Sequence, residues 1–172
     1  VGMALQYQRV NSTENDYILK QISLDTVIRE VIHKYAKIMI RRKILMQYEK
    51  TEVTVISDEK WLAFVLEQLL SNAVKYMSEG ELTIEVREEP QHIWLEIRDT
   101  GIGIRSEDIP RVFEKGYTGF NGHEDKRSTG IGLYLCREVL QKLGHTIQIQ
   151  SELGEGTTVK VGFSKDTIDF RD

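Results

Sequence analysis

The chain has 172 residues, of which 40% are hydrophobic and 29% are charged, and its formal net charge is −4. This length suits one domain with a substantial core, and the mild acidity offers no broad basic face for nucleic acid. No apolar run approaches the roughly 18 residues of a transmembrane helix, and no signal-peptide pattern opens the chain. Its single cysteine, Cys136, cannot form an internal disulfide and its four histidines lack metal-ligand spacing, so we expect a cytoplasmic chain without a zinc site.

Residues 1–13 are predicted to be the end of a longer helix, followed by a linker at 14–22, because one apolar stripe precedes a polar segment. Ser23 is a candidate N-cap for a helix whose apolar positions run from Leu24 to Ala36. The pattern then predicts strands at Leu45–Tyr48 and Val53–Ile56, and a helix that Asp58 caps and that runs to about Tyr76. Next in chain order it predicts strands at Leu82–Val86 and Ile93–Ile97, a short helix at Ser106–Glu114, a helix at Gly132–Leu143 ended by Gly144, and strands at Ile147–Gln150 and Thr157–Phe163. Together these elements predict an α+β fold in two layers, with three helices and a sheet of about five strands.

A carboxylate stands at the end of one predicted strand. Asp99 continues the inward-facing alternation of residues 93–97, so its side chain is expected to be buried. A buried carboxylate needs a hydrogen-bond donor, and an adenine amino group is a suitable one. Gly101 and Gly103 follow at once and allow a sharp turn and the close approach of another molecule. The alternative is an ordinary Asp-x-Gly turn at a strand end.

The second predicted helix carries a polar face. Phe64, Gln68, Asn72, Lys75 and Tyr76 share this face by i+3/i+4 spacing, opposite an apolar core face. The Asn72 carbonyl oxygen can ligate Mg²⁺, the Lys75 ammonium can neutralise phosphate, and the Tyr76 ring can wall a base. A solvent-facing polar stripe is the alternative.

A second glycine pair lies directly before the third long helix, in a segment formed by Thr129, Gly130, Ile131, Gly132 and Leu133. Free backbone N–H groups and the helix dipole make such a point suitable for phosphate. The alternative is a simple flexible lead-in to the helix.

The stretch 116–130 is rich in glycine and charge and is long enough to form a functional lid. Its basic pair, Lys126 and Arg127, can reach a terminal phosphate, although most basic pairs in loops are only solvated. Thr157 brings a hydroxyl to a strand start, where it can share the adenine edge with Asp99. An ordinary β-hairpin is the alternative there.

The order and spacing of these motifs resemble the ATP-binding domain of bacterial sensor histidine kinases. The N, G1, F, G2 and G3 boxes of that family correspond to segments at Asn72–Tyr76, Asp99–Gly103, Phe113–Gly116, Gly130–Leu133 and Gly154–Thr157. The resemblance implies the Bergerat-type fold shared with gyrase, Hsp90 and MutL, in which ATP lies between the helices and a lid. The segments 15–19 and 117–122 are similar to those of the short, membrane-anchored kinases of Firmicutes that sense peptide antibiotics and envelope stress.

The resemblance also implies roles for individual residues, with ATP and Mg²⁺ as the bound groups. It assigns Asn72 to Mg²⁺, Lys75 to phosphate and Tyr76 to the adenosine pocket. It assigns Asp99 to the adenine amino group, assisted by Thr157. The remaining nucleotide-binding positions are Gly101, Gly103, Ile104, Lys126, Arg127, Thr129, Gly130, Gly132 and Leu133.

One position separates the kinases of this fold from its ATP hydrolases. A hydrolase needs a glutamate one turn before the magnesium asparagine to activate water. Gln68 occupies that place and cannot act as a base. Glu67 is five residues before Asn72, so its side chain projects about 140° away from that of Asn72 around the helix axis. We therefore predict a kinase in which Gln68, Asn72 and Lys75 form the catalytic face. A hydrolase, or a nucleotide-binding module that only docks partners, is the alternative.

Histidine kinases carry their accepting histidine in a His-Glu/Asp-x-x-x-Pro-like box, and none of the four histidines here is followed by that pattern. We therefore expect residues 1–13 to be the end of a dimerisation helix, residues 23–165 to be a catalytic domain and residues 166–172 to be a tail. The accepting histidine would lie on the part of the dimerisation domain that is outside this chain. The resemblance implies a cytoplasmic domain of a homodimeric parent protein in the cell membrane. Its partners would be that dimerisation domain and a response regulator, and no nucleic acid.

Overall fold

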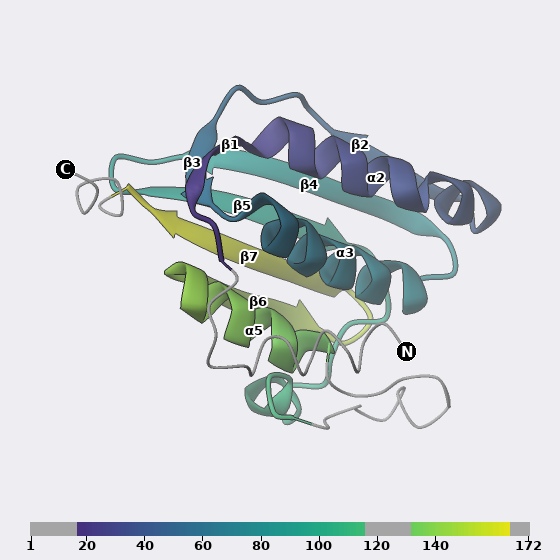
Figure 1. Cartoon of the computed structure of the whole chain (residues 1–172). Coiled ribbons are helices and arrows are strands. Elements are labelled where there is room, and N and C mark those ends of the chain that lie inside the picture. The colour runs from purple at the N-terminus through teal and green to yellow at the C-terminus, as the bar shows by residue number, and fades with distance from the viewer. Residues whose placement is uncertain (1–16, 116–131, 166–172) are drawn as a thin grey trace.

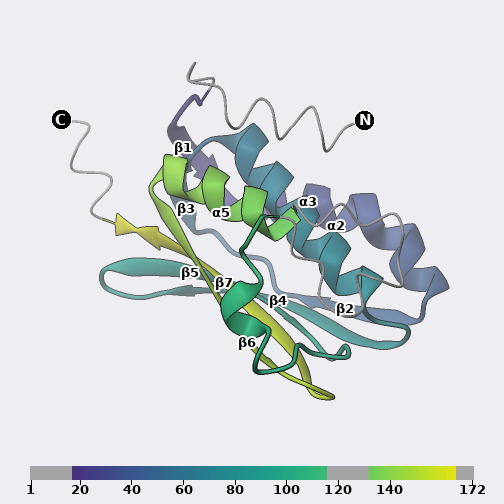
Figure 2. The same ribbon diagram turned by 90° about the horizontal axis from the view of Figure 1, so that it is seen from below.

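A computed structural model describes residues 17–115 and 132–165, and the structural statements below concern these residues. They form two layers, a five-stranded sheet and three α-helices packed on one of its faces (Figure 1). In the view turned by 90° (Figure 2) the three helices lie together on one side, and no described α-helix covers the other. The predicted two-layer α+β architecture is confirmed. The expected helix at 1–13, the lid at 116–130 and the tail at 166–172 lie outside the described residues.

The main sheet is mixed and has the strand order β2-β4-β5-β7-β6. β2 pairs in parallel with β4, and the other three pairings are antiparallel. The strands are longer than predicted, and β5 extends to include Asp99 as its last residue. Their bounds are β2 Ile44–Tyr48, β4 Gly80–Glu88, β5 His92–Asp99, β6 His145–Glu152 and β7 Gly156–Ser164.

The three helices are α2 Leu24–Arg41, α3 Glu59–Lys75 and α5 Gly132–Leu143. They begin close to their predicted positions, and α2 continues five residues beyond Ala36. The predicted N-caps are confirmed: Ser23 accepts the Thr26 N–H, and Asp58 accepts the Trp61 N–H at 2.9 Å. These side chains satisfy backbone donors that a helix start leaves unpaired. In the described part of the chain no helix is both long and apolar enough to cross a membrane.

The core lies between the helices and the sheet. Its fully buried side chains come from all three helices and from the central strands, among them Leu62, Leu70, Leu82, Leu95 and Leu140. Cys136 is also fully buried, as expected of a small core residue. Burial raises the pKa of its thiol well above the ordinary value, so this cysteine is an unreactive packing residue.

A second, two-stranded sheet was not predicted. β1 (Lys20–Ser23) pairs antiparallel with β3 (Thr54–Ser57), away from the main sheet. The expected linker at 14–22 therefore contains the start of a strand, and the strand predicted at Val53–Ile56 does not join the five-stranded sheet. Ile22 and Val55 face each other in this pair and are both buried. Local alternation predicts a strand but does not identify its partner.

The prediction of a short helix at Ser106–Glu114 is wrong. The structure has only a single 3-10 turn, η1, at Ile109–Arg111. Pro110 accounts for the difference, because proline lacks the N–H that an α-helix interior needs and its ring collides with the carbonyl of the residue four positions earlier.

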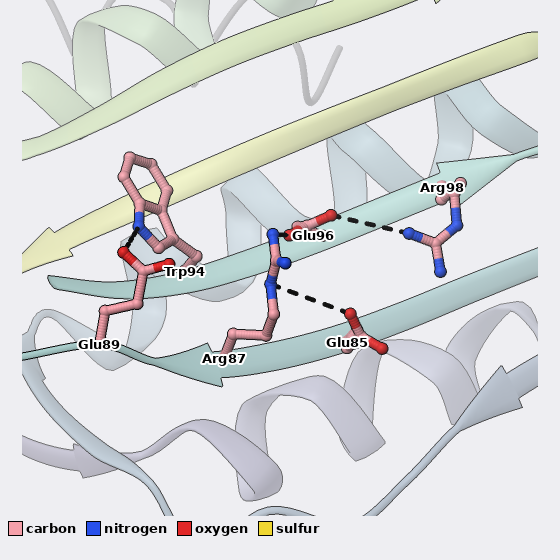
Figure 3. A network of polar contacts seen from close by, with 6 residues as sticks. All are labelled: Glu85, Arg87, Glu89, Trp94, Glu96 and Arg98. Carbon is pink, nitrogen blue, oxygen red and sulfur yellow. Dashed lines mark hydrogen bonds and ion pairs between the residues drawn. The ribbon is translucent and has the colours of Figure 1, made fainter.

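The open face of β4 and β5 carries a network of charged side chains (Figure 3). At its centre Glu96 is only 5% exposed and forms ion pairs with Arg87 and Arg98. At one end the Trp94 Nε1–H donates to Glu89 Oε1 at 3.1 Å. The two guanidinium groups compensate a carboxylate that would otherwise be buried without a partner.

Candidate functional site

The Asp99 side chain is anchored by its own turn and by the neighbouring strand. Its Oδ1 accepts the Gly101 N–H at 2.8 Å and the Thr157 N–H at 3.2 Å. Burial raises the pKa of the Asp99 carboxyl, and these two backbone hydrogen bonds act in the opposite direction. Both of these bonds end on Oδ1. The donor that Asp99 was expected to need is thus supplied in part by the backbone.

Thr157 lies between Asp99 and Ser151 in one row across three strands. It is opposite Asp99 in the β5–β7 pairing and opposite Ser151 in the β6–β7 pairing. It contacts Asp99 through its N–H, whereas its hydroxyl lies 2.8 Å from the Ser151 Oγ. The sequence did not single out Ser151, because one serine in an alternating strand carries no signal until the register of the neighbouring strand is known.

The turn after Asp99 is hydrogen-bonded to the end of β6 and to the turn between β6 and β7. The Gly154 N–H donates to the Ile102 carbonyl at 2.7 Å, and the Ile104 N–H donates to the Ser151 Oγ at 2.8 Å. Ile104, a predicted site residue, is thus held through its backbone. These bonds join the glycine turn to segments that are 52 and 47 positions away in sequence.

Close backbone contacts explain the two glycines of this turn. Gly103 has φ +77°, and a Cβ atom there would lie 2.1 Å from the Glu152 carbonyl oxygen. A Cβ atom at Gly101 would lie 2.9 Å from the Tyr76 carbonyl oxygen. Only glycine fits such approaches without displacing the backbone, so neither position can carry a side chain in this turn.

The amide face of α3 points toward the start of α5. A Cβ atom at Gly132 would lie 3.5 Å from the Gln68 Oε1 and 4.0 Å from the Asn72 Nδ2. Gln68 and Asn72 are half-buried. Phe64 does not share this polar character, because it is buried and its ring packs edge-on against Trp61 at 5.8 Å. The predicted polar face therefore begins at Gln68.

The last turn of α3 holds the two other predicted residues of this helix. The Lys75 ammonium lies 5.4 Å from the centre of the Tyr76 ring. The Tyr76 carbonyl accepts the Ile102 N–H at 3.4 Å, which joins this helix end to the glycine turn. The Arg42 Nη1–H donates to the Val74 carbonyl at 2.7 Å. Sequence reasoning missed Arg42, whose guanidinium is a second donor to a carbonyl at the helix end that also accepts the Met77 N–H at 3.3 Å.

The site therefore has a sheet side and a helix side that meet at the turn 99–103. The sheet side holds Asp99, Gly101, Gly103, Ile104 and Thr157; the helix side holds Gln68, Asn72, Lys75, Tyr76, Gly132 and Leu133. Four predicted site residues, Lys126, Arg127, Thr129 and Gly130, lie outside the described residues. The arrangement sets a carboxylate at one end and amides near a helix N-terminus at the other, which suits a ligand with a hydrogen-bond-donating edge and an anionic tail.

Comparison with known proteins identifies the domain. Residues 57–167 match the family described as histidine kinase-, DNA gyrase B-, and HSP90-like ATPase. The chain belongs to this family. The matched residues include every element from α3 to β7, so this ATPase-family domain contains both sides of the site.

The relatives of this histidine kinase-like ATPase domain are sensor kinases. The sensor histidine kinase YxdK of Bacillus subtilis (strain 168) is 38% identical over 165 residues, covering 92% of this chain and 50% of YxdK. The chain spans about half the length of the curated relatives it matches. The sequence-based identification as the ATP-binding domain of a sensor histidine kinase is confirmed.

Solved structures confirm the fold. Full-length ShkA in complex with AMPPNP has a TM-score of 0.81 at 19% identity, over 93% of this chain and 34% of ShkA. The histidine kinase ThkA in complex with the response regulator protein TrrA has a TM-score of 0.74 at 18% identity, over 95% of this chain and 47% of ThkA.

Proposed function

We propose that this domain binds ATP and transfers the γ-phosphate to a histidine on a dimerisation domain of the same parent protein. Asp99 and Thr157 would hold the adenine, and Asn72, Lys75 and the start of α5 would hold the phosphates. The observation that carries the choice of a kinase over a hydrolase is the amide of Gln68, one turn before Asn72.

Gln68 cannot take a proton from water at neutral pH, so it can position a group but cannot activate a nucleophile. The nearest carboxylate on the same helix, Glu67, points elsewhere. Its Oε1 lies 2.7 Å from the Lys34 Nζ on α2, and this ion pair raises the pKa of Lys34. The side of α3 that faces Gly132 therefore lacks a carboxylate among the described residues. This arrangement favours transfer of the phosphoryl group to an imidazole over its transfer to water.

The residues at this site fit Mg²⁺. The amide oxygen of Asn72 is a hard ligand, and Mg²⁺ is commonly held by one or two protein oxygens together with waters and substrate phosphates. No group of three or more His, Cys, Asp and Glu residues able to hold a metal occurs in the described part of the chain, which agrees with an ion carried mainly by the nucleotide. When bound, the ion would neutralise phosphate charge.

The partners follow from the same proposal. A response regulator accompanies the similar kinase ThkA, and we propose that one receives the phosphoryl group from the phosphorylated histidine here. The parent would be a homodimer in the cell membrane, with this domain on the cytoplasmic side.

Phosphotransfer to a supplied histidine tests the proposal. The chain is incubated with Mg²⁺ and radiolabelled ATP, alone and with the dimerisation domain of its parent. Alone it is expected to acquire no acid-labile phosphohistidine and to hydrolyse ATP very slowly. The added dimerisation domain is expected to become labelled, and a form of that domain with its histidine replaced by alanine is the control.

The variant Gln68→Glu tests the choice between kinase and hydrolase. A carboxylate at this position is expected to raise the slow hydrolysis rate, because it can accept a proton from water. Hydrolysis by the unmodified chain at the rate of a dedicated ATPase, with no label on the dimerisation domain, would favour a hydrolase instead.

A further inference from the structure

The hydroxyl of Ser151 has no free hydrogen-bonding capacity. Its oxygen lies 2.9 Å from the Gly156 carbonyl oxygen, 2.8 Å from the Ile104 N–H nitrogen and 2.8 Å from the Thr157 Oγ1. A serine hydroxyl has one proton to donate and two lone pairs to accept with. The three contacts therefore use the proton and both lone pairs of the Ser151 hydroxyl.

The direction of each hydrogen bond follows from this count. A carbonyl only accepts, so Ser151 must donate its single proton to Gly156. A backbone N–H only donates, so Ile104 occupies one Ser151 lone pair. The contact with Thr157 is a hydrogen bond only if Thr157 donates its hydroxyl proton to the second lone pair. The Thr157 oxygen therefore accepts but does not donate toward the site.

We propose that Ser151 is a positioning residue that determines nucleotide specificity, because it holds the Thr157 hydroxyl as an acceptor beside the Asp99 carboxylate. This inference rests on the proposed function, in which the Asp99 end of the site receives the base. Ser151 itself lies one strand further out and acts through Thr157.

Two neighbouring acceptors select for a base edge that donates. Adenine presents an amino group, which has two protons, whereas guanine presents a carbonyl oxygen at the corresponding position. A carbonyl oxygen placed against the Asp99 and Thr157 oxygens would leave three acceptors without a proton between them. Sites that leave buried polar groups unpaired with the wrong ligand discriminate strongly. If Thr157 were free to rotate, its hydroxyl could donate to that carbonyl, and part of the discrimination would be lost.

The test is a double-mutant cycle on nucleotide selectivity. Calorimetric titration measures the ratio of the Kd for a non-hydrolysable GTP analogue to the Kd for the matching ATP analogue. The variants are Ser151→Ala, Thr157→Val and the double variant. We expect Ser151→Ala to lower the ratio about tenfold, since it frees the Thr157 proton. In the Thr157→Val background the same change is expected to alter the ratio less than about twofold, because no hydroxyl remains to be oriented.

Two further variants separate this role from general damage to the loops. Ser151→Thr keeps the hydroxyl and is expected to retain the wild-type ratio. Thr158→Val makes the same change as Thr157→Val on the next residue of β7, whose side chain alternates to the open face of the sheet, and is also expected to retain it. Thermal unfolding of every variant reports whether the fold is kept.

The possible results differ clearly. An equal fall in the ratio in both backgrounds would overturn the inference, because Ser151 would then act through Ile104 and not through Thr157. A wild-type chain that selects ATP and a Ser151→Ala variant with the same selectivity would overturn it while leaving the proposed function intact. A wild-type chain that binds neither analogue would overturn both.

Discussion

The His145 Nε2 atom lies 2.9 Å from the Ser57 Oγ atom, and both residues are buried. Ser57 ends β3 in the small sheet and His145 begins β6 in the main sheet. The ring also packs edge-on against Phe163 at 4.6 Å, and its Nδ1 is buried without a hydrogen-bond partner in the described structure. The bond thus joins two sheets that share no strand, in surroundings that disfavour a charged ring.

Acid is therefore expected to weaken the fold through His145. Burial lowers the pKa of His145 to about 4, against about 6.5 in an unfolded chain. Between these values the unfolded chain binds a proton that the folded chain does not, so stability falls as the pH falls from about 6.5 to 4, by a total on the order of 3 kcal/mol. Urea unfolding at several pH values measures this loss.

The paired variant Ser57→Ala with His145→Leu is expected to remove that part of the pH dependence, since it removes both polar partners together. His33→Gln, on the exposed face of α2, is the matched control and is expected to leave it unchanged. If the paired variant lost as much stability as the wild-type chain over the same pH range, the pH dependence would have to come from other groups.

Replacing Asp99 by asparagine is expected to abolish tight binding of an ATP analogue and to leave the fold intact. The amide oxygen can still accept the Gly101 and Thr157 N–H groups, but the amide nitrogen replaces Oδ2 and turns an acceptor into a donor. The cost in binding is expected to be about 2–4 kcal/mol by calorimetric titration. Glu155→Gln removes the same charge from the nearby turn and is the control. An affinity within threefold of wild type would reject the assignment of Asp99.

Two glycines with similar backbone angles are expected to respond differently to alanine. Gly103 has φ +77° and Gly154 has φ +85°, so both substitutions strain the backbone. Only the Gly103 Cβ would meet an atom, the Glu152 carbonyl oxygen, whereas nothing lies within 4 Å of a Cβ at Gly154. We expect a loss of about 1 kcal/mol for Gly154→Ala and about 3 kcal/mol for Gly103→Ala in denaturant unfolding. Equal losses would show that the two turns are not packed as described.

Arg42 is expected to support nucleotide binding without touching the nucleotide. Its hydrogen bond to the Val74 carbonyl holds the last turn of α3, next to Lys75 and Tyr76. Arg42→Met is expected to cost about 1–2 kcal/mol of stability and to weaken binding of an ATP analogue several-fold. Arg41→Met, on the exposed neighbouring residue, is the control and is expected to change stability by less than about 0.5 kcal/mol. Unchanged affinity in Arg42→Met would limit its role to stability.

Much of the candidate site could be predicted because its residues lie in regular elements. The spacing of apolar residues placed α2, α3 and α5 and their caps, and alternation along β5 placed Asp99 on the side that contacts Thr157. Phe64 was assigned to the polar face wrongly, since helical spacing gives the angle of a side chain but not what the next helix covers. The helix expected at Ser106–Glu114 does not form because of Pro110. Proline is tolerated in the first turn of a helix but not in its interior, so its effect depends on where the helix begins.

The sequence by itself determined the three long helices, the positions of the main strands along the chain, the alternation that leads to Asp99 and the glycine-rich turns, because each depends on neighbours only a few positions away. Only the tertiary structure decided that β1 and β3 form their own sheet, that Ser57 meets His145, that Arg42 holds the end of α3, and that Ser151 directs the Thr157 hydroxyl. Each of these contacts joins residues on different elements. The physical reason is that strand pairing and side-chain hydrogen bonds depend on the register between distant segments, which the packing of the whole core selects.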